Sequence, residues 1–92
     1  MAVLTSALKS ESAQFASNAS HHRQLSGDLA ELAARIAIGG DERSRQRHVE
    51  RGKMLPRERV DRLLDPGAPF LEVGQLGGHE LYADTIPSGG II

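Results

Sequence analysis

Apolar residues recur at helical spacing in one stretch of the chain, which then stops at two glycines. Their separations of four, three and four residues place them on one face of an α-helix; they are Leu25, Leu29, Leu32 and Ile36. Gly39 and Gly40 follow, and a glycine can take the left-handed conformation that ends a helix at no steric cost. The pattern predicts an amphipathic helix that ends before Gly39. Its start is left open, either near Ser26 or further back through Phe15.

The chain is short and poor in large side chains, so any core must be small. Its 92 residues include no Trp, two Phe and one Tyr, and a chain of this size buries only about 60 to 65% of its unfolded surface. The absence of cysteine excludes disulfides and thiolate metal sites as substitutes for a core. No apolar run approaches the ~20 residues of a membrane-spanning helix. These features predict a soluble chain and are compatible with a reducing, intracellular setting.

Charge is distributed unevenly along the chain, although its net charge is −1. Residues 41–62 hold eight of the eleven Lys and Arg but only five of the twelve acids. From Leu63 onward there is no cation. Within the basic stretch, Asp41 can cap a helix over Glu42–Arg51 that has almost no apolar face. Such a helix must be held by charge pairs, by neighbours or by a ligand.

A third short helix is predicted to begin at Pro56, where the missing N–H of proline costs nothing. Val60, Leu63 and Leu64 supply its buried side. The turn Asp65-Pro66-Gly67 then ends it.

After this turn the pattern changes from helical to short apolar segments separated by glycines. The runs at Phe70–Val73 and Glu80–Tyr82 are typical of strands bounded by turns. Gly89-Gly90-Ile91-Ile92 resembles a turn that opens into a further strand, and a lone strand needs partners for its backbone groups. We therefore expect an α+β chain, helical from about residue 10 to 64 with strands and turns over 65–92, and truncated at its end.

Two ordered runs carry a family resemblance: Arg51-Gly52-Lys53-Met54-Leu55-Pro56-Arg57-Glu58-Arg59-Val60 and Leu63-Leu64-Asp65-Pro66-Gly67-Ala68-Pro69-Phe70-Leu71-Glu72. They resemble the signature near the start of acyl-CoA carboxyltransferase beta subunits, and the resemblance extends over nearly all of the chain. The Leu55-Pro56 pair and the Pro69–Glu72 run are closer to the methylcrotonyl-CoA and geranyl-CoA branches than to the propionyl-CoA branch. The methylcrotonyl-CoA type is preferred, which makes this chain the amino-terminal part of the first carboxyltransferase domain.

The resemblance implies a crotonase-like fold and transfer of a carboxyl group from carboxybiotin to an acyl-CoA. It also implies partners: a biotin-carrying alpha subunit, other beta subunits in a hexamer, and the acyl-CoA substrate, with no nucleic acid and no membrane. The oxyanion-binding glycine loops that stabilise the enolate lie beyond residue 92 in this family. This chain alone is thus expected to be inactive, with no catalytic or metal-binding residue and no bound cofactor. A bacterial cytoplasmic location is expected, with the mitochondrial matrix as the alternative because Met1–Gly27 is rich in Ser and Ala.

Four cations are the candidate substrate-binding residues, since the phosphates of CoA call for cations and Arg can clamp phosphate with two N–H groups. They are Arg51, Lys53, Arg57 and Arg59. The competing interpretation is a solvated or subunit-contacting face in which Glu50, Glu58 and Asp61 pair with these cations. The adjacent His21 and His22 point to different sides of a helix, so they do not form a metal site.

Two other functions fit the same residues. The basic region 43–62 could track a nucleic-acid backbone, although its acids and the scarcity of aromatic residues in the chain argue against it. Alternatively, the chain is a small helical interaction module that contacts other subunits and touches no substrate.

Overall fold

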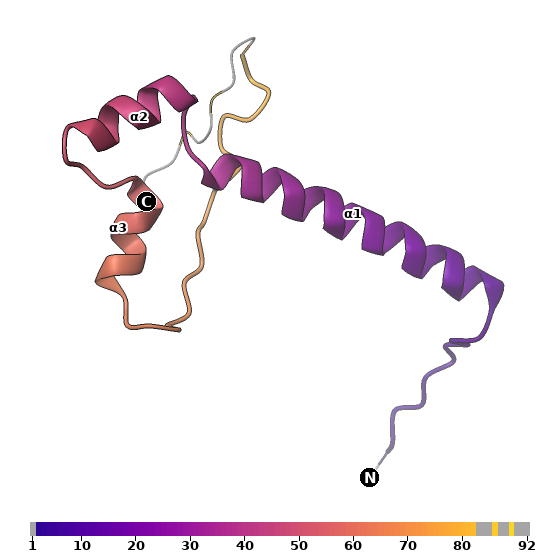
Figure 1. Cartoon of the computed structure of the whole chain (residues 1–92). Coiled ribbons are helices and arrows are strands. Elements are labelled where there is room, and N and C mark those ends of the chain that lie inside the picture. The colour runs from indigo at the N-terminus through magenta and orange to yellow at the C-terminus, as the bar shows by residue number, and fades with distance from the viewer. Residues whose placement is uncertain (1, 83–85, 87–88, 90–92) are drawn as a thin grey trace. The chain divides into compact units, whose positions relative to one another are not determined.

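The computed structural model describes residues 2–82, 86 and 89. Its regular structure consists of three helices, α1 (Ala13–Ala37), α2 (Glu42–Glu50) and α3 (Pro56–Leu63) (Figure 1). The chain divides into two compact units, Met1–Ala30 and Glu31–Ile92. The regular secondary structure of the described residues is therefore all helical.

The ends of α1 follow from local capping. Its first residue is Ala13, so the helix reaches back through Phe15. The Oγ of Ser12 accepts a hydrogen bond from the Phe15 N–H at 3.1 Å, which satisfies one of the free N–H groups of the first turn. At the other end Gly39 has φ +95°, and its N–H donates to the carbonyl of Ile36 at 3.0 Å. The predicted end of this helix is confirmed.

The two short helices are confirmed, and each is capped by an acid. Asp41 precedes α2 and accepts from the Ser44 N–H at 2.8 Å, while its second oxygen accepts from the Ser44 hydroxyl at 2.6 Å. Pro56 is the first residue of α3. Leu55 has no acceptor in its side chain, so the cap of α3 is one-sided: Glu58 reaches back to accept from the Leu55 N–H at 2.8 Å.

The turn predicted at Asp65-Pro66-Gly67 after α3 is confirmed. The Ala68 N–H donates to the Asp65 carbonyl at 2.9 Å, and Gly67 has φ +78°. Proline at the second position and a positive φ at the third define a type II turn. This turn separates α3 from the extended segment that follows.

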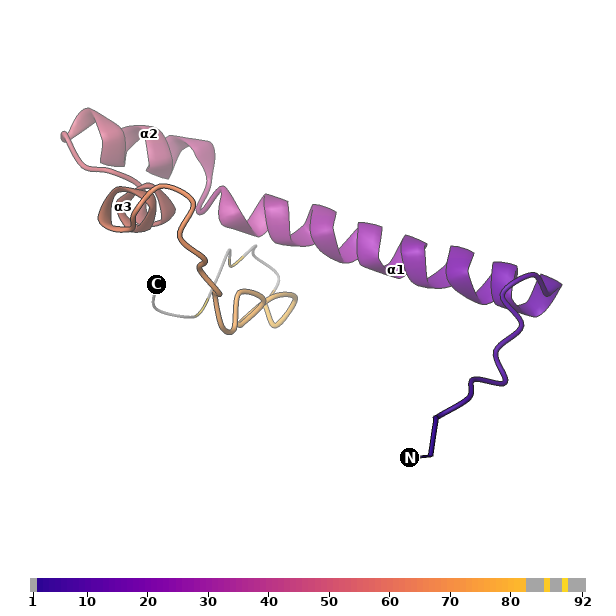
Figure 2. The same ribbon diagram turned by 90° about the horizontal axis from the view of Figure 1, so that it is seen from below.

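The expected strands do not form in the described part of the chain, where the coloured ribbon after α3 carries no strand arrow (Figure 2). Among the described residues, 70–73 and 80–82 have no neighbouring strand to pair with, and an unpaired strand is not stable. Residues 74–81 instead form successive turns, in which the Gly77 N–H donates to Gly74 at 2.9 Å and the His79 N–H to Leu76 at 3.0 Å. The strand predicted to start at 91–92 lies outside the described residues.

Burial is confined to one end of α1. Ile36 is 5% exposed and is the one buried hydrophobic side chain among the described residues. In contrast, Leu63, Leu71 and Val73 are 84 to 85% exposed. The prediction that Leu63 lies on a buried side of α3 is therefore wrong. None of the described helices is both long and apolar enough to cross a membrane.

Candidate functional site

The structure places the four candidate cations on two neighbouring elements of the second unit. Arg51 is the C-cap of α2, and Lys53 lies in the connection that follows it. Arg57 and Arg59 lie in the first turns of α3. A side-chain contact fixes this connection: the His48 ring Nε2 lies 2.9 Å from the Met54 carbonyl oxygen.

Arg57 differs from the other three because its guanidinium is largely enclosed by its own chain. Its Nε lies 2.9 Å and its Nη2 2.5 Å from the two carboxylate oxygens of Glu72. Its Nη1 donates to the Ala37 carbonyl at 3.1 Å, with the Ile36 carbonyl at 3.5 Å. The two side chains of the ion pair are 21% and 14% exposed.

This arrangement makes Arg57 a clamp between three segments of the unit. The last carbonyls of a helix lack intrahelical partners and carry the negative end of the helix dipole, so a cation at the end of α1 stabilises it. The fork of an arginine fits a carboxylate in a bidentate pair, and Glu72 brings in the extended segment after α3. The donors of Arg57 are therefore engaged within the chain.

A second side-chain contact joins α1 to the chain that follows α3. Gln75 Nε2 donates to the carbonyl oxygen of Ala33 in α1 at 2.8 Å. Sequence reasoning missed the roles of Glu72 and Gln75. One signal was available: Glu72 is the only charged residue among the apolar residues between Pro69 and Val73, and a charge in such a stretch calls for a partner.

The remaining three candidate cations, Arg51, Lys53 and Arg59, are exposed. Among the described residues none of them lies within ion-pairing distance of a carboxylate. The expected internal pairs with Glu50, Glu58 and Asp61 are thus not formed there, and Glu58 is used to cap α3 instead. The structure separates Arg57, which is engaged, from three cations that face solvent. Contact of these residues with CoA phosphates stays a prediction.

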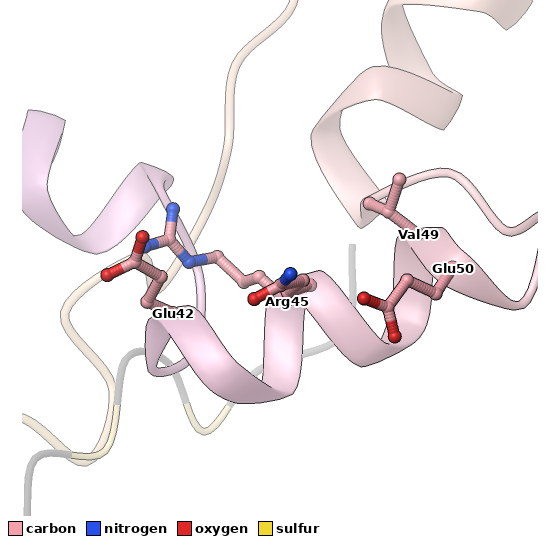
Figure 3. Close-up of a pocket in the computed structure, with 5 residues that line it drawn as sticks. Glu42, Arg45, Val49 and Glu50 are labelled. Atoms are coloured by element: carbon pink, nitrogen blue, oxygen red, sulfur yellow. The ribbon is translucent and has the colours of Figure 1, made fainter.

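Arg45 is the half-buried cation of α2. Its Nε is buried and has no hydrogen-bond partner in the described part of the chain. The side chain extends toward the amino-terminal end of α2, where Glu42 lies (Figure 3). A shallow surface depression beside it is lined by α2 alone, with Gln46, Val49 and Glu50 completing the lining. Because a single helix lines it, this depression does not form an enclosed ligand site.

The histidines do not assemble into a metal centre in the part of the chain that the structure describes, where no group of three or more potential ligands occurs. His21 and His22 lie in α1 with ring centroids 5.8 Å apart. His79 lies 3.6 Å from Glu80, its sequence neighbour.

Comparison with known proteins gives consistent matches. No protein-family model matches the chain. It is 57% identical over 74 residues to the biotin-dependent 3-methylcrotonyl-coenzyme A carboxylase beta1 subunit of Mycobacterium tuberculosis, which covers 80% of this chain and 14% of that protein. It is 44% identical over 90 residues to the mitochondrial methylcrotonoyl-CoA carboxylase beta chain of Arabidopsis thaliana, covering 98% and 15%. A probable mitochondrial beta chain of Drosophila melanogaster is also 44% identical, over 91 residues covering 98% and 16%. The chain spans about 15% of the length of these relatives.

Proposed function

Because the chain belongs to the methylcrotonyl-CoA carboxylase beta-subunit family and matches the amino-terminal 15% or so of its members, we propose that it is part of a carboxyltransferase subunit. The subunit transfers a carboxyl group from carboxybiotin to 3-methylcrotonyl-CoA. The observation that carries this proposal is the 57% identity to a beta subunit whose name specifies that acyl-CoA. The biotin is carried by a partner subunit, and the catalytic domain has a crotonase-like fold.

Within that subunit the segment has a structural or assembly role. Leu63, Leu71 and Val73 are 84 to 85% exposed, and burying a side chain of this size stabilises a structure by about 1.5 to 3 kcal/mol. Leu71 and Val73 flank Glu72, which is paired with Arg57, and Leu63 lies in the same unit. They pack against the remainder of the carboxyltransferase subunit or against a neighbouring subunit.

Contact with the acyl-CoA is a narrower part of the proposal. Arg51, Lys53 and Arg59 are exposed cations and are available to the phosphates of CoA. Arg57 has its donors directed to Glu72 and to α1, so we assign it to the structure of the segment. Substituting Arg51 or Arg59 would then raise KM for the acyl-CoA without lowering kcat.

The cellular location is inferred from the organisms of the relatives. The bacterial relative from Mycobacterium tuberculosis is 57% identical, whereas the plant and fly relatives are named mitochondrial and are each 44% identical. The higher identity favours the bacterial cytoplasm.

The function is tested with a complete beta subunit that contains this chain, assembled with its biotin-carrying partner. Incorporation of labelled bicarbonate should be fastest with 3-methylcrotonyl-CoA, measured against geranyl-CoA and propionyl-CoA at equal concentrations. A higher kcat/KM for either competitor would overturn the assignment of substrate. No carboxylation of any acyl-CoA would overturn the assignment of reaction.

The structural role is tested in the same complex. The double substitution L71S/V73S removes apolar surface from the exposed segment, and we expect less assembled complex by light scattering. V3S/L4S is the matched control, because these side chains are 82% and 99% exposed in the first unit. Equal loss of assembly in both variants, or in neither, would contradict a specific role for residues 71–73.

A further inference from the structure

One face of α2 carries a regular row of arginines. Arg43, Arg47 and Arg51 follow one another at four-residue intervals, and all three are exposed. In an α-helix a step of four residues returns to nearly the same face and advances by about 6 Å. The row therefore presents three guanidinium groups to solvent at a repeat of about one helical turn.

In the part of the chain that the structure describes, no acid forms an ion pair with this row. The described Lys and Arg side chains form one ion pair, Arg57 with Glu72. Asp41 accepts two hydrogen bonds from Ser44 in the cap of α2, and Glu58 is directed to the backbone of Leu55. The guanidinium groups of the row are consequently available to bind carboxylates of another molecule.

We infer that the row Arg43-Arg47-Arg51 is a docking surface for an acidic helix of a partner protein, with carboxylates four residues apart. Such a helix repeats its charges at the same interval of about 6 Å, so successive carboxylates face successive guanidinium groups. Each arginine can hold a carboxylate with two parallel N–H bonds. The inference rests on the geometry of α2 and is independent of the carboxyltransferase proposal.

A second row on α2 argues for a protein as the occupant. Glu42, Gln46 and Glu50 run beside the arginines with the same spacing, so a uniformly negative polymer would meet two carboxylates along with the cations. Residues 41–62 also contain no Phe, Tyr or Trp on which bases could stack. A protein helix can place a basic or neutral row opposite the acidic one, which is the kind of complementarity that sets partner and register.

The probe for this surface is a fluorescein-labelled helical peptide of alanine, glutamate and lysine with glutamates at every fourth position. Its binding to the 92-residue chain is measured by fluorescence anisotropy at about 20 mM and about 300 mM NaCl, because exposed ion pairs are screened by salt. We expect R43Q/R47Q to weaken binding about five- to tenfold at low salt. R43K/R47K should lose less, because it keeps the charge.

The matched control is K9Q/R23Q, which removes the same charge from the first unit. It should bind the peptide as the unchanged chain does. Equal weakening by both double variants would show that only net charge matters and would overturn the inference. Stronger binding of a duplex RNA than of the peptide at the same salt, lost in R43Q/R47Q, would overturn it in favour of nucleic acid. Glutamine is a good helix former, and circular dichroism verifies that α2 is retained.

Discussion

The apolar repeat of α1 lies in the second half of the helix, from Leu25 to Ile36, and its residues differ in burial. Leu25 and Leu29 are 50% and 54% exposed, whereas Ile36, seven residues beyond Leu29, is 5% exposed. Within the unit that contains Ile36, two side chains also bind backbone carbonyls in the last turns of α1, Arg57 at Ala37 and Gln75 at Ala33. An apolar period therefore identifies the face of a helix that can be buried, while burial itself depends on what the rest of the chain brings to it.

The largest expected effect follows from removing the buried end of this repeat. Ile36→Ala leaves a cavity at the one buried hydrophobic side chain of the described residues, and we expect a loss of about 2 to 3 kcal/mol in stability. Leu29→Ala is the matched control on the same helix face and should cost less than about 0.5 kcal/mol. Thermal unfolding followed by circular dichroism measures both. Similar losses from the two substitutions would show that these two positions of the repeat do not differ in burial.

The clamp gives the next largest effect. Arg57→Ala leaves the Glu72 carboxylate half-buried without its partner and removes a donor from the end of α1, at a cost of about 2 kcal/mol. Amide hydrogen exchange should become faster at residues 33–38 and 70–75, with little change at residues 16–28. The control Arg59→Ala removes an exposed cation from the same helix. If Arg59→Ala accelerates exchange as much, the interactions of Arg57 do not hold the unit together.

A smaller effect is expected at the opposite end of α1, where one hydroxyl provides the cap. Ser12→Ala removes the acceptor for the Phe15 N–H. We expect it to destabilise the first turn of α1 by about 1 kcal/mol. Ser17→Ala, in the body of the helix, should be neutral or slightly stabilising. Chemical shifts of residues 13–16 report the fraying. A loss of helix at residues 33–37 in the Ser12 variant would contradict local capping.

Local chemistry was the predictable part of this molecule, as three features show. Gly39 ends α1, Asp41 caps α2 and Pro56 begins α3, each because the preference lies within a few residues of sequence. The clamp could not be predicted in the same way, because Arg57 and Glu72 lie 15 residues apart and their pairing depends on the path of the turn between them. The strands expected at 70–73 and 80–82 failed for a similar reason, since a strand exists only with a partner.

The smallest effect extends the comparison to α2, which has no buried residue and so depends on its polar cap. Hydrogen bonds from the Ser44 hydroxyl and N–H lower the pKa of Asp41 below its usual value of 3.8, because they favour the charged carboxylate. The stabilising contribution of the cap is therefore fully present above pH 3.8 and is lost as pH falls through the lower pKa of the folded form. The Ser44 amide shift, followed by NMR, should titrate with a midpoint below 3.8. Asn caps a helix about as well as Asp but does not titrate. In the Asp41→Asn variant the chemical shift of the Ser44 amide should therefore not change with pH in this range. A midpoint at or above 3.8 in the unchanged chain would show that Ser44 does not hold the carboxylate.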